Sequence, residues 1–316
     1  MASLTEEGEG PMDSVTVYAP GSASNLGAGF DCLGVAFTGM GDRVLARRAD
    51  APGIRVVASS DPRIPREADR NTAAIAAARV LTRLKREAGL DLELSKGLPL
   101  SAGLGGSAAS AVAGALAADA LLETRLSTSE LLGCALEAES LVSGRHADNV
   151  APALLGGAVL LRGLDPVALT AVGVHPSLAL VLVTPAYEVE TARARALLPQ
   201  DVSRGDAVSQ ASRLASLVLG LERGDLDLVR DGMRDAIAEP RRLPLYPGYL
   251  EACAAGLEAG AAGIAVSGSG PSLVAITPAA RTLPVARALE EAYRKEGVSA
   301  VSHCAQVDTL GARVVG

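Results

Sequence analysis

The sequence predicts an α+β protein of two lobes. Its 316 residues exceed the length at which one hydrophobic core usually stops growing. Strand and helix patterns fill the first half, a cluster of proline and glycine follows at 163–176, and the pattern then begins again. We therefore predict an N-terminal lobe over residues 14–165, a C-terminal lobe over 170–316 and a short disordered head over 1–13.

The composition argues against several classes of function. Apolar residues make up 49% of the chain and aromatic residues only 2%, so Ala, Val and Leu must pack the interior. The net charge is −7 and basic residues are interspersed with acidic ones, which argues against a nucleic-acid partner. We find no signal-peptide pattern and no membrane-spanning stretch, and expect a cytoplasmic protein without membrane contact. The four cysteines are isolated, which is typical of reduced thiols.

In the first lobe, alternating and helical patterns of apolar residues predict the elements in order. Asn71 begins one helix, and Ser127 and Glu130 form a capping box that begins another. The predicted strands are 15–19 (ending at Pro20 and Gly21), 44–48, 54–58, 91–95 and 159–161, and the predicted helices are 71–87, 107–122 and 127–141.

The second lobe shows the same kinds of pattern and is predicted as a layered α+β arrangement. The predicted strands are 178–183, 263–267, 272–277 and 299–306, and the predicted helices are 203–222, 224–238, 248–260 and 282–295.

After the strand 91–95, the run from Pro99 to Ala109 holds three glycines and two hydroxyls and leads into the helix 107–122. Glycine allows positive φ and close approach of the backbone, and the first turn of a helix presents N–H groups, so this order of elements is typical of a phosphate cradle. The run lacks the lysine of a Walker A loop and the spacing of a dinucleotide fingerprint. A glycine turn that only caps a core helix is the alternative.

Glu139 falls on the apolar face of the helix 127–141, in line with Leu132, Ala135 and Leu136. An uncompensated buried carboxylate is costly, so Glu139 must be paired, bound to a metal, or solvated in a frayed last turn. A hard oxygen ligand for Mg²⁺ beside a phosphate loop is the sharper hypothesis.

A polar cluster follows this helix, and we interpret it as a loop before the strand at 159. His146, Asp148 and Asn149 offer a donor, a carboxylate and an amide within four residues. That combination suits the binding of a hydroxyl-bearing substrate, and a purely structural histidine is the alternative.

Two other segments, 21–31 and 263–272, are also glycine-rich, and each alone is a weak signal. Together with the central run they resemble the motifs of the GHMP kinase family: an N-terminal substrate motif, a P-x-x-x-G-L-G-S-S-A phosphate loop and a C-terminal G-x-x-x-S-G-[SG]-G motif. Gly106 stands where the family usually has the first serine, and the second is kept as Ser107. The resemblance implies a mixed-sheet N-terminal lobe that carries the phosphate loop and a C-terminal lobe with a ferredoxin-like α/β sandwich.

Four segments are most similar to the branch of this family that phosphorylates L-homoserine. They are YAPGSASNLGAGFDCLGVAF (18–37), SGRHADNVAPALLGG (143–157), TARARALLP (191–199) and AEPRRLPLYPGY (238–249). The resemblance implies a homodimer that uses Mg²⁺ and ATP to make O-phospho-L-homoserine for threonine synthesis. A mevalonate-type kinase of the same family and a non-catalytic nucleotide-binding regulator of the same fold are the alternatives.

The resemblance also assigns residues to the amino acid. Arg195 and Arg242 are expected to hold its carboxylate and Asp31 its ammonium group, and Arg242 is favoured over the adjacent Arg241. Asn25, His146 and Asn149 are expected at its remaining polar edge and at the reacting hydroxyl.

For the nucleotide, the resemblance implies phosphates over Gly103 to Ser107, Mg²⁺ held by Ser107 and Glu139, and Asn71 beside the adenine. The residues expected at ATP are Pro99, Leu100, Ser101, Ala102, Gly103, Leu104, Gly105, Gly106, Ser107, Ala108, Asn71, Gly268 and Ser269. Catalysis is expected to come from positioning by Ser107, His146 and Asn149. Asp148 is the candidate for a general base, although this branch is thought to work without one.

Overall fold

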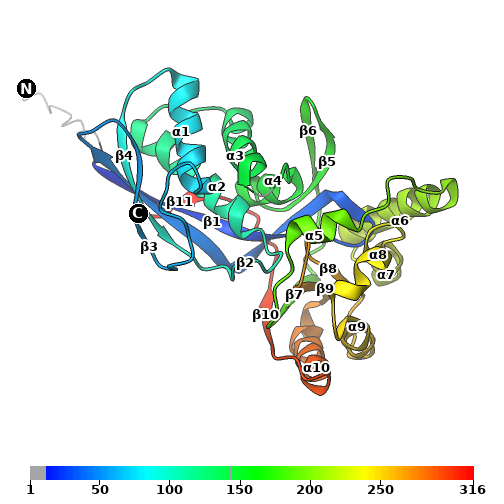
Figure 1. Ribbon diagram of the computed structural model, residues 1–316. Coiled ribbons are helices and arrows are strands. Elements are labelled where there is room, and N and C mark those ends of the chain that lie inside the picture. Colours follow the sequence, from blue (N-terminus) through cyan, green and yellow to red (C-terminus); the bar gives the residue numbers. More distant parts are fainter. Residues whose placement is uncertain (1–11, 143) are drawn as a thin grey trace, which may run out of the picture.

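Two sheets organise the molecule, one in each lobe, in a computed structural model that describes residues 12–142 and 144–316 (Figure 1). Of the head predicted over 1–13, all but Met12 and Asp13 lies outside the described residues. The mixed sheet of the first lobe and the antiparallel sheet of the second confirm the predicted α+β class.

The first sheet runs in the order β11-β1-β2-β4-β3, and β5 and β6 extend it from β2. Only β3 and β4 pair in parallel, and the other pairs are antiparallel. The strands are β1 (Ser14–Asn25), β2 (Gly29–Ala49), β3 (Gly53–Ser59), β4 (Gly89–Ser95), β5 (Ala158–Leu164), β6 (Val167–Val172) and β11 (Arg313–Val314).

Figure 1 shows the helices of the first lobe gathered on one face of this sheet, and α2 packs on β1 and β2. Most residues of α2 are buried all round, because this helix lies between the sheet and α1, α3 and α4. The helices are α1 (Thr72–Leu84), α2 (Gly106–Leu122), α3 (Thr128–Val142) and α4 (Ala147–Leu155).

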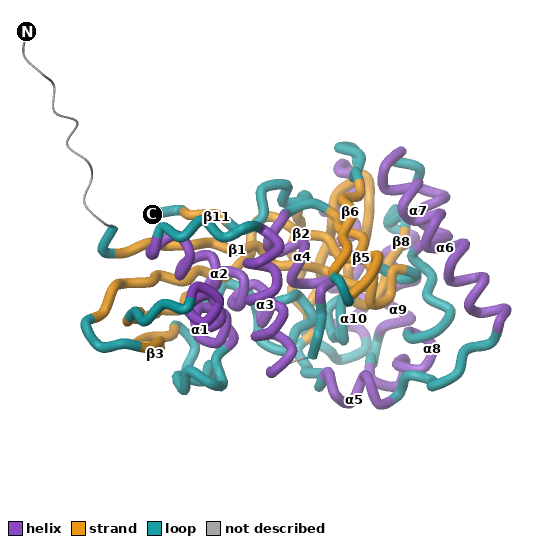
Figure 2. Tube along the Cα trace, turned by 90° about the horizontal axis from the view of Figure 1, so that it is seen from above, coloured by secondary structure: helices purple, strands orange, loops and turns teal. Residues whose placement is uncertain are grey.

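The second sheet runs in the order β10-β7-β9-β8 and is antiparallel throughout. Figure 2 shows from above that the helices within 204–242 lie at the end of the molecule away from α1 and β3. The strands are β7 (Leu178–Pro185), β8 (Gly263–Val266), β9 (Leu273–Pro278) and β10 (Ala300–Ala305). The helices are α5 (Thr191–Ala196), α6 (Arg204–Arg223), α7 (Leu226–Gly232), α8 (Glu239–Arg242), α9 (Tyr249–Glu258) and α10 (Thr282–Lys295), with short 3-10 turns at Leu243–Leu245 and Ala279–Arg281.

One hydrophobic core continues from the first lobe into the second. Leu180 and Leu182 of β7 and Ile276 of β9 belong to the same buried cluster as Val35 of β2 and Leu26, which lies in the turn between β1 and β2. A second cluster lies on the other face of the second sheet, under α9 and α10. The two lobes are therefore packed together through one buried core.

Several elements differ from those predicted. Strand β1 does not end at Pro20, because its pairing with β2 continues after a register shift between Pro20 and Gly21. The helix predicted over 224–238 is shorter than expected. Helix α7 spans Leu226–Gly232, and the next helix, α8, begins at Glu239. Strand β6 was not predicted from its short pattern between Pro166 and Gly173, and it still pairs with the first sheet. The short elements α5 and β11 were also missed.

None of the helices in the described part of the chain combines the length and the apolar content that a transmembrane span requires.

The contact between α1 and α2 depends on Gly114. A Cβ atom there would lie 2.3 Å from the Ala73 carbonyl oxygen, which is backbone and cannot move aside. We expect Gly114→Ala to lower the free energy of unfolding by about 1–3 kcal/mol in urea denaturation. At Gly133 of α3 a Cβ would meet only the flexible end of Arg83 at 3.4 Å, so Gly133→Ala is the matched control and should be neutral or stabilising by up to ~1 kcal/mol. Equal effects of the two substitutions would contradict this packing.

Candidate active site

A pocket of about 370 Å³ lies where the two lobes meet, and both lobes line it. It is lined by every residue that the sequence predicted at a ligand except Ala108, which is fully buried in α2. The predicted residues that line it are Asn25, Asp31, Asn71, Pro99, Leu100, Ser101, Ala102, Gly103, Leu104, Gly105, Gly106, Ser107, Glu139, His146, Asp148, Asn149, Arg195, Arg242, Gly268 and Ser269.

The glycine loop leads directly into α2, which begins at Gly106. Gly103 and Gly105 both have positive φ, of 75° and 68°. A Cβ on Gly105 would lie 2.1 Å from the Ser22 hydroxyl, and one on Gly103 would lie 2.3 Å from the Ser267 carbonyl oxygen. Glycine is therefore required at both positions, for its conformation and for its lack of a side chain. The start of α2 faces the pocket, and the N–H groups at a helix start favour an anion.

Ser107 and Glu139 form a pair at the loop. The Ser107 hydroxyl donates to Glu139 Oε2 at 2.6 Å, and Glu139 is only 4% exposed. The burial excludes a frayed, solvated Glu139. Magnesium is usually bound by one or two protein oxygens together with water and substrate phosphates, so these two hard oxygen donors beside a phosphate loop fit Mg²⁺. No group of three or more His, Cys, Asp or Glu side chains arranged for a metal occurs within 12–142 and 144–316.

Asp31 and Arg195 meet across the pocket from opposite lobes. The guanidinium donates to both carboxylate oxygens at 2.8 and 3.0 Å, and one of its nitrogens lies 3.1 Å from His146 Nδ1. Asp31 has a positive φ of 57°, and its backbone N–H donates to Asn25 Oδ1 at 3.0 Å. The pair is part-exposed, with about two fifths of each side chain open to solvent, so a charged ligand can reach it.

Arg242 is a second cation in the pocket and is only 4% exposed. Its Nε donates to the Ala194 carbonyl at 3.0 Å, and its guanidinium lies over the Phe30 ring at 5.0 Å from the centroid. Burial lowers the pKa of Arg242 from its ordinary value. The neighbouring Arg241 is exposed and does not line the pocket.

Asp148 and Asn149 lie in the first turn of α4, where the sequence predicted a loop. That prediction rested on the cluster of polar residues and was wrong, because the chain is helical over Ala147–Leu155. The helix contains Pro152, and the Asp148 carbonyl lies against Gly34. The Asn149 side chain accepts a hydrogen bond from the Ser22 hydroxyl at 3.0 Å and is thereby fixed toward the glycine loop. Burial raises the pKa of the Asp148 carboxyl, and the nearby charge of Asp31 raises it further.

Asn71 has a structural role at the start of α1, where the sequence predicted that a helix begins. Its Oδ1 accepts from the backbone N–H groups of Ala73 and Ala74, and its Nδ2 donates to the Pro65 carbonyl at 2.8 Å. It thus caps α1 and ties the segment before it to the rim of the pocket, where an adenine contact stays a prediction.

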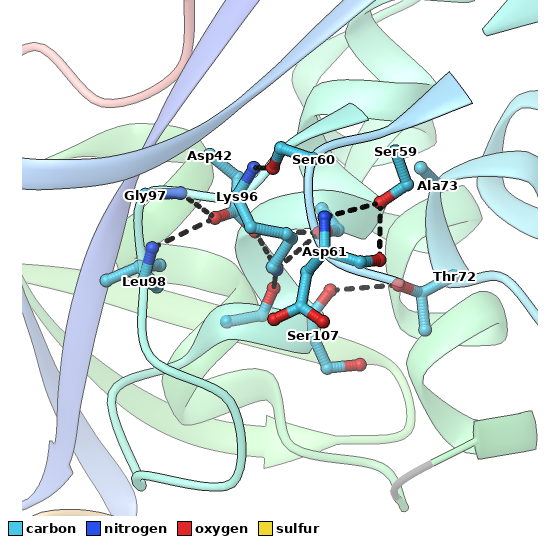
Figure 3. A network of polar contacts seen from close by, with 12 residues as sticks. Asp42, Ser59, Ser60, Asp61, Thr72, Ala73, Lys96, Gly97, Leu98 and Ser107 are labelled. Carbon is cyan, nitrogen blue, oxygen red and sulfur yellow. Dashed lines mark hydrogen bonds and ion pairs between the residues drawn. The ribbon is translucent and has the colours of Figure 1, made fainter. Parts of the chain in front are cut away.

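Sequence reasoning missed Lys96 and Ser110, which also line the pocket. Figure 3 shows Lys96 close to Asp42, beside Gly97 and Leu98. A lysine directly after a strand and three residues before Pro99 was the available signal, but a lone lysine is usually a surface residue.

Comparisons with known proteins show what the chain is similar to. The chain matches the GHMP kinases N terminal domain over residues 71–157 and the GHMP kinases C terminal domain over 217–297. It is 40% identical over 304 residues to the homoserine kinase of Xanthomonas campestris pv. campestris (strain B100), covering 94% of this chain and 93% of that protein. It is 44% identical over 264 residues to that of Xylella fastidiosa (strain 9a5c), covering 82% and 80%. A crystal structure of homoserine kinase from Cytophaga hutchinsonii matches with a TM-score of 0.93 and 38% identity, over 99% of this chain and 100% of that one.

The half-buried carboxyl of Glu239 makes the stability of this lobe depend on pH. Its burial raises its pKa to about 7, whereas an unfolded glutamate titrates near ~4.3. The folded state therefore binds this proton more tightly, so the stabilisation is complete below the unfolded pKa and is lost as the pH rises toward 7.

We expect the free energy of unfolding of the native protein to fall between pH 5 and pH 8 by roughly 1–3 kcal/mol more than that of Glu239→Gln. Urea denaturation at four pH values measures the difference. Glu251→Gln, on the exposed side of α9, is the control for removal of a carboxylate. Parallel curves for the native protein and Glu239→Gln would contradict the shift.

Proposed function

The chain belongs to the homoserine kinases of the GHMP kinase family, and from this premise we propose that it transfers the γ-phosphoryl group of ATP to the side-chain hydroxyl of L-homoserine. The observation that carries the proposal is a single pocket lined both by the glycine loop and by charged residues suited to an amino acid, which are Asp31, Arg195 and Arg242. The product is O-phospho-L-homoserine. We further propose that the protein acts as a homodimer in the cytoplasm.

The triphosphate of ATP lies along residues 103–108 in this proposal. The glycine backbone and the start of α2 offer N–H donors there without side chains in the way. Gly268 and Ser269, from the loop after β8, close the other side of the pocket. This loop is held to the first lobe, since the Gly268 N–H donates to the Ser24 carbonyl at 3.1 Å.

Ser107 and Glu139 would hold Mg²⁺. When bound, the ion neutralises the negative charge that phosphate oxygens carry during transfer. Glu139 is placed for this by the periodicity of α3, and Ser107 by its position in the first turn of α2.

The amino acid binds on the opposite side of the pocket. Arg242 and Arg195 attract its α-carboxylate, and Asp31 attracts its α-ammonium group. Without substrate, Arg195 and Asp31 satisfy each other, so a zwitterion can replace their single ion pair with two. Asn25, His146 and Asn149 line the same pocket, which supports their proposed role at the remaining polar edge of the amino acid and at the reacting hydroxyl.

We propose that no dedicated general base is needed. Phosphoryl transfer has a loose transition state, so positioning and charge stabilisation supply most of the rate. Asp148, the candidate for a base, is 4% exposed and fixed in the first turn of α4. Because its pKa is raised, the Asp148 carboxyl keeps its proton to a higher pH than an ordinary aspartate does.

An assay coupled to ADP release, with homoserine, threonine, serine, mevalonate and galactose at fixed Mg²⁺ and ATP, tests the acceptor. We expect strong preference for homoserine. Turnover with mevalonate alone would favour the mevalonate-type alternative, and no ADP release with any acceptor would favour a nucleotide-binding regulator.

Removal of either arginine should weaken binding of the amino acid and spare the nucleotide. We expect Arg195→Ala and Arg242→Ala to raise KM for homoserine by about 10- to 100-fold, since each loses a charge-assisted hydrogen bond, with KM for ATP within about threefold. Arg193→Ala and Arg241→Ala remove exposed arginines from the same two helices and serve as controls. An unchanged KM for homoserine in both pocket variants would contradict the amino-acid assignment.

Loss of the Glu139 carboxylate should weaken the metal site. We expect Glu139→Gln, which keeps the shape of the side chain, to need at least about tenfold more Mg²⁺ for half-maximal activity and to lose at least about tenfold in kcat. Glu137→Gln on the exposed side of α3 is the control. The proposal fails if Glu139→Gln and Glu137→Gln share the Mg²⁺ dependence of the native protein.

A further inference from the structure

A buried ion pair lies beneath the glycine loop, and no step of the proposed reaction uses it. Asp42 of β2 and Lys96, which directly follows β4, are in contact, and their side chains are 1% and 6% exposed (Figure 3). Both charges are taken out of water, which costs several kcal/mol per ion. Apolar side chains of similar volume often replace such a pair without loss of stability, so its presence calls for another reason.

Asp42 fastens the chain where it enters the loop. Its Oδ1 accepts from the backbone N–H groups of Gly97 and Leu98, at 3.1 and 3.4 Å. Its Oδ2 accepts from the Ser110 hydroxyl at 2.7 Å and from the Lys96 ammonium group. Four donors thus converge on one carboxylate, and an uncharged amide would bring a donor of its own among them.

Lys96 fastens the chain where it leaves the loop. Its ammonium group donates to the Gly106 carbonyl at 3.0 Å, to the Ser110 hydroxyl at 2.9 Å, and to Asp42. These three acceptors match the three ammonium hydrogens. From the other side, the Thr72 hydroxyl donates to the Ser107 carbonyl at 3.3 Å. The first two carbonyls of α2 are therefore both held by side chains.

The single ion pair consequently connects both ends of the segment from Gly97 to Gly106. It sets the distance between the end of β4 and the start of α2, and it fixes the peptide group that links Gly106 to Ser107. The carboxylate also cancels the charge of the ammonium group. The pair is therefore suited to hold the shape of the loop.

We propose that Asp42 is a positioning residue for nucleotide binding, which acts through Lys96 and Ser110 to hold the glycine loop in the form that accepts phosphates. This rests on the proposed function only in that the loop binds a nucleotide. Nothing in it requires that homoserine be the acceptor.

The test compares Asp42→Asn with Asp308→Asn. Asp308 is the matched control because it is also a buried carboxylate, 4% exposed, that accepts from two backbone N–H groups, those of Leu310 and Gly311, and pairs with one cation, Arg313. It does not line the pocket. Both substitutions should lower Tm, so a loss of Tm alone does not separate them.

We expect Asp42→Asn to raise the Kd for Mg-ADP in calorimetry by at least about tenfold, and KM for ATP likewise, while KM for homoserine stays within about twofold. Backbone amides of residues 97–108 should exchange hydrogen faster in the ligand-free Asp42→Asn variant than in the native protein. Asp308→Asn should leave the Kd and the exchange of this segment unchanged. A folded Asp42→Asn variant with native Mg-ADP affinity would overturn the proposal.

Ser110→Ala is the milder second variant, because it removes one partner from each ion and leaves the pair itself. We expect it to fold and to weaken Mg-ADP binding by about threefold. If Asp42→Asn does not fold, native affinity in Ser110→Ala overturns the proposal. A native protein that binds Mg-ADP but does not phosphorylate homoserine would contradict the proposed acceptor and leave this comparison intact.

Discussion

The glycine loop cannot hold its form by itself, and the rest of the site depends on the two segments that enclose it. The Ser22 N–H donates to the Leu104 carbonyl at 3.2 Å from the first lobe, and the Ser272 N–H donates to the Ala102 carbonyl at 3.1 Å from the second. Glycine conformations with positive φ are costly in entropy, so these contacts are needed to select one of them. Because one segment belongs to each lobe, the loop takes this form only where the lobes are packed together.

This arrangement explains why the pocket gathers charges from distant parts of the chain. The continuous core fixes the position of one lobe relative to the other. Arg195 of α5 therefore contacts Asp31, although the two are 164 positions apart in the sequence. In the ligand-free pocket Arg195 and Asp31 compensate each other's charge, so a charged ligand exchanges partners with this pair. A zwitterionic acceptor suits such a site, because its carboxylate can pair with Arg195 and its ammonium group with Asp31 when their own ion pair opens.

Much of the fold could be predicted from the sequence, because periodicity is strong in long apolar segments such as α2 and β7. The face of α3 that carries Glu139 could also be predicted, since a carboxylate in an apolar stripe needs a partner. The polar residues at 145–149 misled, because they predicted a loop and the chain is helical from Ala147. The role of Asp42 could not be predicted, because a single acidic residue in a long strand has no distinctive sequence pattern. Its contacts with Lys96 and Ser110, which come from other elements, exist only in the folded structure.

The most direct measurement is a crystal structure of the protein with Mg²⁺, a non-hydrolysable ATP analogue and L-homoserine. We expect the triphosphate along residues 103–108, the metal ion against Ser107 and Glu139, and the amino acid between Asp31 and Arg242. A nucleotide bound elsewhere, with the glycine loop making no contact to phosphate, would contradict the central claim.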